Sequence, residues 1–111
     1  MIEEQYVSFD TAKLLREAGF KANCAFILDD NQERLYRPTQ ELAARWLREI
    51  HHYAVCVWFS KDHEKWFYAH GNMDNIMFDT DYCISEYIYD SYEEAFEAGL
   101  QEALKLIIKN K

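Results

Sequence analysis

The sequence predicts an α+β fold in a single globular domain over residues 1–111, with three helices packed on a four- to five-stranded, mainly antiparallel sheet. The predicted order is α-β-β-α-β-β-β-α. Two patterns carry this prediction: residues 90–111 are amphipathic with a helical period, and residues 53–59 place valines and aromatics at the period of a strand. Half of the 111 residues are hydrophobic and one is proline, so the chain can bury a core without disulfide or metal support.

A first helix and a hairpin are predicted at the beginning of the chain. Ser8 can cap a helix that runs to about Ala18, because its hydroxyl can accept a hydrogen bond from an unpaired backbone N–H, and Gly19 is typical of a helix end. Two β-prone runs follow, Cys24–Leu28 and Arg34–Arg37. The polar residues between these runs predict a turn, and therefore a hairpin.

A second helix is predicted from its cap, Thr39, to about His51. Pro38 closes the preceding strand because it disfavours helical geometry in the residue before it. The apolar residues of this helix recur at helical spacing and form the expected buried stripe: Leu42, Ala43, Trp46, Leu47 and Ile50. Trp46 is expected to anchor the core.

Three strands are predicted after this helix. The run Tyr53–Phe59 is apolar on both faces, so we expect it at the centre of the sheet. Its two faces are expected to be Val55, Val57 and Phe59 on one side and Ala54, Cys56 and Trp58 on the other. The runs Lys65–Ala69 and Tyr82–Tyr89 supply the other two strands.

The C-terminal segment carries the clearest helix pattern. Ser91 can cap it, and Glu94 stands three residues later, which completes a capping box. The apolar face consists of Tyr92, Phe96, Leu100, Ala103, Leu104 and Ile107. The polar residues of the other face, which include Glu97 and Gln101, are expected to be solvated. Gly99 lies on the apolar side, which predicts a close approach of this helix to the sheet.

Charge and hydropathy argue against several classes of partner. The formal net charge is -8 at pH 7 and the sequence pI is about 4.9, whereas nucleic acids and anionic membranes select clustered lysine and arginine. We therefore expect no direct nucleic-acid binding and no membrane binding. No apolar run approaches the roughly 20 residues needed to cross a bilayer, and the N-terminal residues lack the pattern of a signal peptide. The expected location is the cytoplasm.

The sequence contains no recognised catalytic, cofactor or metal motif. Its three cysteines are widely spaced and are expected to be small buried hydrophobes: Cys24, Cys56 and Cys83. Two histidines are expected at the end of the second helix and two in or beside turns: His51 and His52, then His63 and His70. A metal site formed by these histidines is the alternative. Its oxygen ligands would come from Asp62, Glu64, Asp74 and Asp79.

Aromatic residues make up 16% of the chain, and some of them must reach the surface. A half-buried sheet can bury most of these rings, but tyrosine and tryptophan are also enriched in protein interfaces. The predicted interaction surface consists of Trp58, Trp66, Tyr68, Tyr87 and Tyr89. An exposed aromatic sheet face would serve a protein partner or a homodimer.

Three segments carry a resemblance to a known group of proteins: YVSFDTAKLLREAGF at 6–20, PTQELAARWLREIH at 38–51 and YDSYEEAFEAGLQEALKLI at 89–107. With these segments the chain resembles a family of small uncharacterised proteins that recurs in gut bacterial genomes and in their phages or mobile elements. The resemblance implies a small α+β protein of unknown activity, related to phages or mobile elements. It carries over no catalytic or binding residue.

We therefore expect a non-catalytic interaction or accessory module that binds a protein partner. We expect no cofactor, and the sequence does not identify the partner. Its contact surface would be the aromatic sheet face or the segment 62–81. Two alternatives stay open. One is an acidic mimic that occupies a basic nucleic-acid-binding site on a host protein. The other is a small metal-dependent enzyme that uses His51, His52, His63 or His70.

Overall fold

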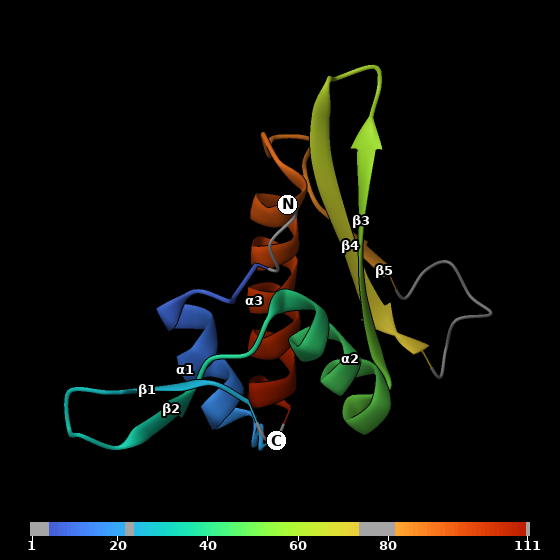
Figure 1. The fold of residues 1–111 in the computed structure, drawn as a ribbon. Coiled ribbons are helices and arrows are strands. Elements are labelled where there is room, and N and C mark those ends of the chain that lie inside the picture. The colour runs from blue at the N-terminus through green and yellow to red at the C-terminus, as the bar shows by residue number, and fades with distance from the viewer. Residues whose placement is uncertain (1–4, 22–23, 74–81, 111) are drawn as a thin grey trace.

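The computed structural model describes residues 5–21, 24–73 and 82–110. Its elements follow the order α-β-β-α-β-β-β-α, which confirms the predicted α+β fold (Figure 1). In chain order, the helices and strands of the described residues are α1 Phe9–Glu17, β1 Phe26–Leu28, β2 Arg34–Tyr36, α2 Gln40–His51, β3 Tyr53–Ser60, β4 Lys65–Asn72, β5 Tyr82–Ile84 and α3 Tyr92–Lys109.

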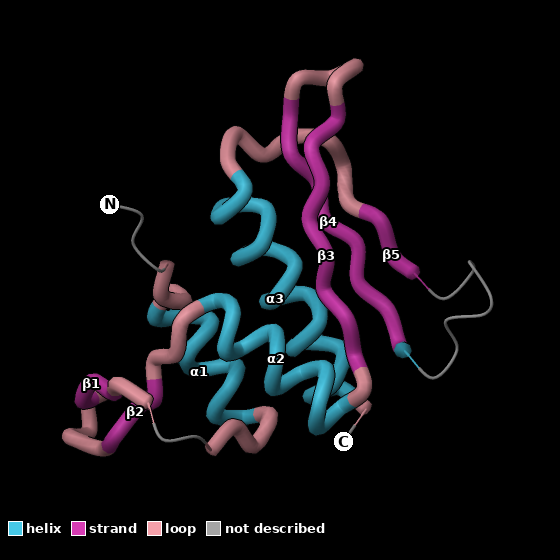
Figure 2. The backbone as a smooth tube through the Cα atoms, turned by 45° about the vertical axis from the view of Figure 1, so that its right-hand side comes forward, coloured by secondary structure: helices cyan, strands magenta, loops and turns pink. Residues whose placement is uncertain are grey.

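The strands form two antiparallel sheets, one of β1 and β2 and one in the order β3-β4-β5. Figure 2 shows β4 between β3 and β5. The expectation that β3 would be central is therefore wrong. Apolar side chains on both faces of a strand do not require a neighbouring strand on each edge.

The predicted strand Tyr82–Tyr89 is shorter in the structure. Regular pairing with β4 ends at Ile84, and the chain returns to β4 through an isolated bridge between Tyr89 and Trp66. The Ser85 hydroxyl accepts a hydrogen bond from the Tyr68 N–H at 2.9 Å. A side chain thus takes the place of the backbone acceptor that a regular ladder would supply, which interrupts the strand.

The three helix starts confirm the predicted caps. The hydroxyls of Ser8, Thr39 and Ser91 accept from the backbone N–H three residues later in α1, α2 and α3. The capping box differs in one detail, because the Glu94 carboxylate accepts from the N–H of Asp90 at 3.2 Å. The first hairpin also forms as expected, around an Asp29 carboxylate that accepts from two backbone N–H groups of the turn.

Helix α3 lies between α1 and the three-stranded sheet (Figures 1 and 2). It approaches the sheet closely at Gly99, where an added Cβ would lie 2.9 Å from Val55 Cγ1 and 3.1 Å from Tyr68 Cγ. The predicted close approach at Gly99 is therefore confirmed. The face of the sheet that carries Val55 and Tyr68 is the inner face, and the opposite face is the outer face.

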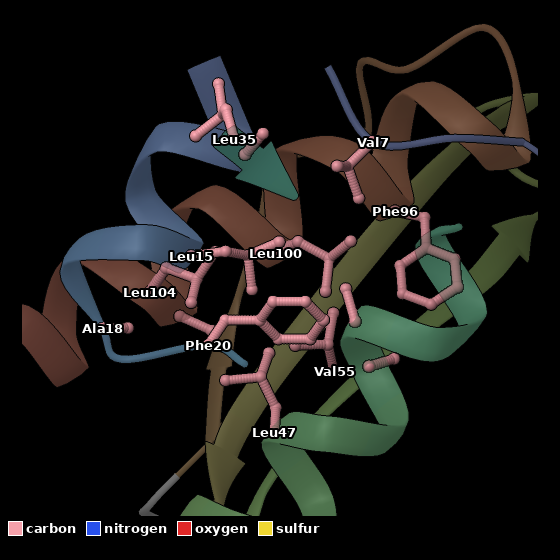
Figure 3. Packing of buried hydrophobic residues seen from close by; sticks show 14 residues of the cluster. Val7, Leu15, Ala18, Phe20, Leu35, Leu47, Val55, Phe96, Leu100 and Leu104 are labelled. Atoms are coloured by element: carbon pink, nitrogen blue, oxygen red, sulfur yellow. The ribbon is translucent and has the colours of Figure 1, made fainter. Parts of the chain in front are cut away.

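The core lies where α1, α2, α3 and β3 meet (Figure 3). Its fully buried large apolar side chains include Val7, Leu15, Leu35, Leu47, Leu100 and Leu104. The predicted stripe of α2 is partly wrong, because Ala44 is buried while Ile50 is 61% exposed. The inward face of α2 is rotated toward Ala44, which moves Ile50 toward solvent. Trp46 is half-buried and contacts Phe20 edge-on, with ring centroids 5.2 Å apart.

Replacing Gly99 by alanine should lower the free energy of unfolding. Overpacking a core costs about 1–3 kcal/mol, and the better helix propensity of alanine offsets about 1 kcal/mol of this, so the net loss should be about 1 kcal/mol. Urea denaturation measures it. An Ala98→Gly variant, one position away in α3, is the control for helix propensity. An alanine variant more stable than the parent would contradict the close approach.

Candidate interaction surface

The outer face of the three-stranded sheet carries a connected group of rings. In the β3–β4 register Trp58 lies opposite Phe67, and the two rings stack with centroids 5.7 Å apart. The Tyr87 ring contacts Phe67 edge-on at 4.8 Å, and the His63 imidazole stacks on Tyr87 at 4.3 Å. We call these four residues the outer aromatic cluster. Trp58 is 49% exposed and Tyr87 is 41% exposed, so both present ring surface to solvent.

The outer aromatic cluster lies on the side of the sheet away from the described helices. Helices α2 and α3 contact the sheet (Figure 2). Helix α3 covers the inner face at Val55 and Tyr68. Side chains alternate between faces along a strand, which places Trp58 and Phe67 opposite to Val55 and Tyr68. Ile84 is the register partner of Ala69, on the same face as Phe67, and is 64% exposed. The outer face is therefore apolar beyond the rings themselves.

The predicted five-residue surface is divided by the sheet. Trp58 and Tyr87 belong to the outer aromatic cluster, whereas the other three lie on the inner face or at its margin. Tyr68 is 9% exposed and lies beneath Gly99. Burial raises the pKa of its hydroxyl to about 12. Trp66 is half-buried against Tyr92, with centroids 5.6 Å apart, and forms the β-bridge with Tyr89.

Two members of the cluster, Phe67 and His63, were not predicted as interaction residues. The signal for Phe67 was available, because Trp66 and Tyr68 flank it and must face the other side of a strand. His63 follows β3 in the turn to β4, and its Nδ1 lies 2.9 Å from the Ser60 hydroxyl. Its stacking on Tyr87 depends on the return of the chain after β5, which has no signal in the sequence.

A groove of about 550 Å³ lies between the segment before α1, the start of α2 and the first turns of α3. Its lining residues are Gln5, Tyr6, Ser8, Arg37, Gln40, Tyr89, Glu93, Glu94, Glu97, Ala98 and Gln101. The expectation that Glu97 and Gln101 would be solvated is only partly correct, because both residues are half-buried. Both face α1, and Gln101 donates to the Thr11 hydroxyl at 3.0 Å.

Glu97 joins three elements through its carboxylate. One oxygen accepts from the backbone N–H and the hydroxyl of Ser8, both at 3.0 Å, and also from the hydroxyl of Thr11. The other oxygen accepts from the Gln40 amide at 3.1 Å. A carboxylate at the N-terminus of α1 is favoured because unpaired N–H groups and the helix dipole make that end positive. The arrangement explains Glu97 as a structural connection between α1, α2 and α3.

The histidines lie in three parts of the described chain: the end of α2, the β3–β4 turn and the interior of β4. His51 ends α2 and His52 is its left-handed C-cap, as expected for the helix end, while His63 lies in the β3–β4 turn. His70 lies inside β4 and is 4% exposed, so its expected place beside a turn is wrong. Its Nδ1 is 2.7 Å from the Tyr53 hydroxyl. Burial lowers the pKa of His70, and the charge of Glu102 opposes this shift.

No three His, Cys, Asp or Glu side chains among the described residues come together to hold a metal ion. Asp74 and Asp79, two of the oxygen ligands considered above, lie outside the described residues, as do all of residues 74–81 of the segment 62–81. The described part of the chain therefore gives no geometric support to the metal alternative.

The cysteines differ from the expectation of buried hydrophobes. Cys24 and Cys56 are half-buried, and Cys83 is exposed on β5. Cys24 lies before β1 rather than within it. Burial raises the pKa of the Cys24 thiol, which opposes formation of the thiolate that a nucleophilic cysteine needs.

Comparisons with known proteins give no relative on which a function could be based. No protein-family model matches the chain, no curated protein matches it, and no solved structure matches its fold. The resemblance to small proteins of gut bacteria and their phages therefore stays a prediction. Within the described residues, no helix has both the length and the apolar character that a bilayer span requires.

Replacing Glu97 by alanine should lower the free energy of unfolding by about 1–3 kcal/mol, because a buried donor that loses its acceptor keeps its full desolvation cost. Thr11 is fully buried and does not line the groove, so water cannot easily replace the carboxylate as the acceptor of its hydroxyl. Urea denaturation tests this. Glu93→Ala, an exposed carboxylate in the same helix, is the matched control and should change stability by less than about 0.5 kcal/mol. Equal effects of the two variants would contradict the assigned role.

Stability should fall as pH decreases below about 6.5, the ordinary pKa of histidine, because of His70. The pKa of His70 is depressed in the folded state, so the unfolded chain binds the proton more readily. Lowering the pH therefore stabilises the unfolded state relative to the folded state. The contribution is complete above pH 6.5 and is lost as pH falls toward the folded pKa. Urea midpoints at pH 7.5 and 5.5 should differ more for the parent than for His70→Gln. An identical pH dependence of the two proteins would contradict this assignment.

Proposed function

We propose that this protein is a non-catalytic binding module whose contact surface is the outer aromatic cluster. The observation that carries the proposal is the exposure of Trp58 and Tyr87 on a sheet face that the described helices leave uncovered. Tryptophan and tyrosine dominate the energetics of many protein interfaces because each ring buries a large area at a low cost in side-chain entropy. Here the rings are already stacked on one another, so little further ordering is needed on binding.

The charge of the chain suits a basic protein partner. The net charge is -8 at pH 7, and exposed carboxylates directly flank two members of the cluster in the chain: Asp62 and Glu64 beside His63, and Glu86 beside Tyr87. A partner with an apolar centre and lysine or arginine at its rim would complement this surface, and opposite charges would accelerate association at low salt. Nucleic acid does not fit, because phosphates would be repelled by the same carboxylates.

The other two expected functions receive no specific support from the geometry. The described histidines do not form a group of three ligands with other metal-binding side chains. Occupation of a basic nucleic-acid-binding site requires an extended acidic surface, whereas Glu97 is half-buried and bonded to Ser8, and Asp29 is buried and paired with Arg16. A relation to phages or mobile elements stays part of the proposal and does not depend on the surface.

Replacing Trp58 by alanine should weaken binding to the partner by more than about 30-fold, the range of an interface hot spot. The partner would be captured on tagged protein from the native cell and then measured in purified form by calorimetry. Tyr6→Ala is the control, because Tyr6 is 47% exposed outside the outer aromatic cluster. Retention of the partner by Trp58→Ala, or its loss with Tyr6→Ala, would place the contact surface elsewhere.

A further inference from the structure

Strand β3 forms one edge of the three-stranded sheet and carries no charged residue from Tyr53 to Ser60. Exposed edge strands present unpaired backbone groups to other chains, and proteins usually protect them with lysine, proline or a bulge. Strand β3 has eight residues without proline, and its pairing with β4 is continuous from Tyr53–Asn72 to Ser60–Lys65. The edge is thus long and regular and has none of these protections. It is most exposed near the turn, at Trp58 and Phe59, whereas Val55 is 7% exposed within the core.

The direction of the backbone groups in β3 follows from the bonds that β4 makes on its other side. The Trp66 N–H donates to Tyr89, and the Tyr68 carbonyl accepts from Ser85, both at 2.8 Å. Successive residues of a strand direct their backbone groups to opposite edges, so the N–H and C=O groups of Phe67 are directed toward β3. The backbone groups of Trp58, the register partner of Phe67, are therefore directed toward β4.

The backbone groups of the alternate residues of β3 must then be directed away from β4. These are Val55, Val57 and Phe59, whose N–H and C=O groups are directed to the free edge. No hydrogen bond joins these backbone groups to another segment of the described chain. They form a row of donors and acceptors with the spacing that an added strand requires.

We propose that two copies of the chain pair antiparallel through their β3 edges and form one continuous six-stranded sheet. Antiparallel pairing of a strand with its own copy needs only a two-fold axis, because each copy offers the other the same donors and acceptors. The same axis keeps the two outer faces on one side of the joined sheet. The two outer aromatic clusters would then lie on one surface.

The charges near β3 agree with a second copy as the occupant. Each chain carries -8, but the seam itself is uncharged, so the repulsion between the copies acts at a distance and is screened by salt. Antiparallel pairing brings the β3–β4 turn of one copy beside the last turn of α2 of the other. The turn contains Asp62 and Glu64 against one lysine, Lys61. The last turn of α2 contains Arg48, whose neighbour Glu49 is paired with Arg45, so the excess negative charge of the turn meets a positive side chain at both ends of the seam.

Sedimentation equilibrium of the purified chain tests the pairing. The parent should have twice the chain mass of 13.3 kDa, and Phe59→Pro should have the mass of one chain. Proline removes an N–H that is directed to the free edge, so no bond between β3 and β4 is lost. Phe59→Ala is the matched control, because it loses the same ring contact with Trp66 but keeps the N–H, and it should remain a dimer.

A parent that sediments at 13.3 kDa at its highest concentration would overturn the proposal, as would a dimeric Phe59→Pro that keeps the parent's circular dichroism. A dimer that dissociates with Trp58→Ala and not with Phe59→Pro would also overturn it. Amide hydrogen exchange needs no variant: exchange at Val55, Val57 and Phe59 should slow as the concentration of the parent increases. Concentration-independent exchange at these amides would contradict the pairing. Loss of the partner with Trp58→Ala tests the proposed function separately.

Discussion

The contact of α3 with the sheet at Gly99 is the constraint on which the other features of this fold depend. A Cβ at this position would lie 2.9 Å from Val55 Cγ1, so the absence of a side chain sets how close the helix axis lies to β3 and β4. That distance determines which side chains fit between the layers. It also directs the opposite side of α3 toward α1 and α2, where Glu97 meets the start of α1. Gly99 thus determines both the apolar contact of α3 with the sheet and the polar contact of Glu97 with the start of α1.

Because side chains alternate along the strands, this contact buries one face of the sheet and leaves the other exposed. Val55 and Tyr68 face α3 and are buried, whereas Trp58 and Phe67 face away and stack with each other. The helix layer covers the inner face, which leaves rings on the outer face with roughly half of their surface in water. The stacking limits their freedom, since each ring is held by its neighbours. A preorganised apolar face on an acidic protein is the physical basis for the proposed binding role.

The features that depend on local chemistry could be predicted from the sequence. The caps Ser8, Thr39 and Ser91 were predictable because a cap needs only a hydroxyl beside an unpaired N–H. The order of elements followed from periodicity in the same way. The central position of β4 was not predictable, because strand order depends on where distant segments return. The same holds for Glu97, whose partners are 57 to 89 residues away in the chain. The aromatic content of the strands indicates an interaction surface that includes Trp58 and Tyr87. Trp66 and Tyr68 do not belong to it, because the alternation of side chains along β4 places them on the inner face.

The junction between α2 and β3 consists of one residue, His52, in a left-handed conformation with φ of 52°. Helix and strand therefore have no loop between them in which a change of chain length could be absorbed. An insertion or deletion of one residue here would exchange the two faces of β3, so that Trp58 would point into the core and Val55 into water. Variation in length is tolerated more easily at the far end of the hairpin, in the exposed turn 61–64. Among relatives of this chain, the length of the α2–β3 junction should therefore be constant, and changes in hairpin length should come as pairs of residues at that turn.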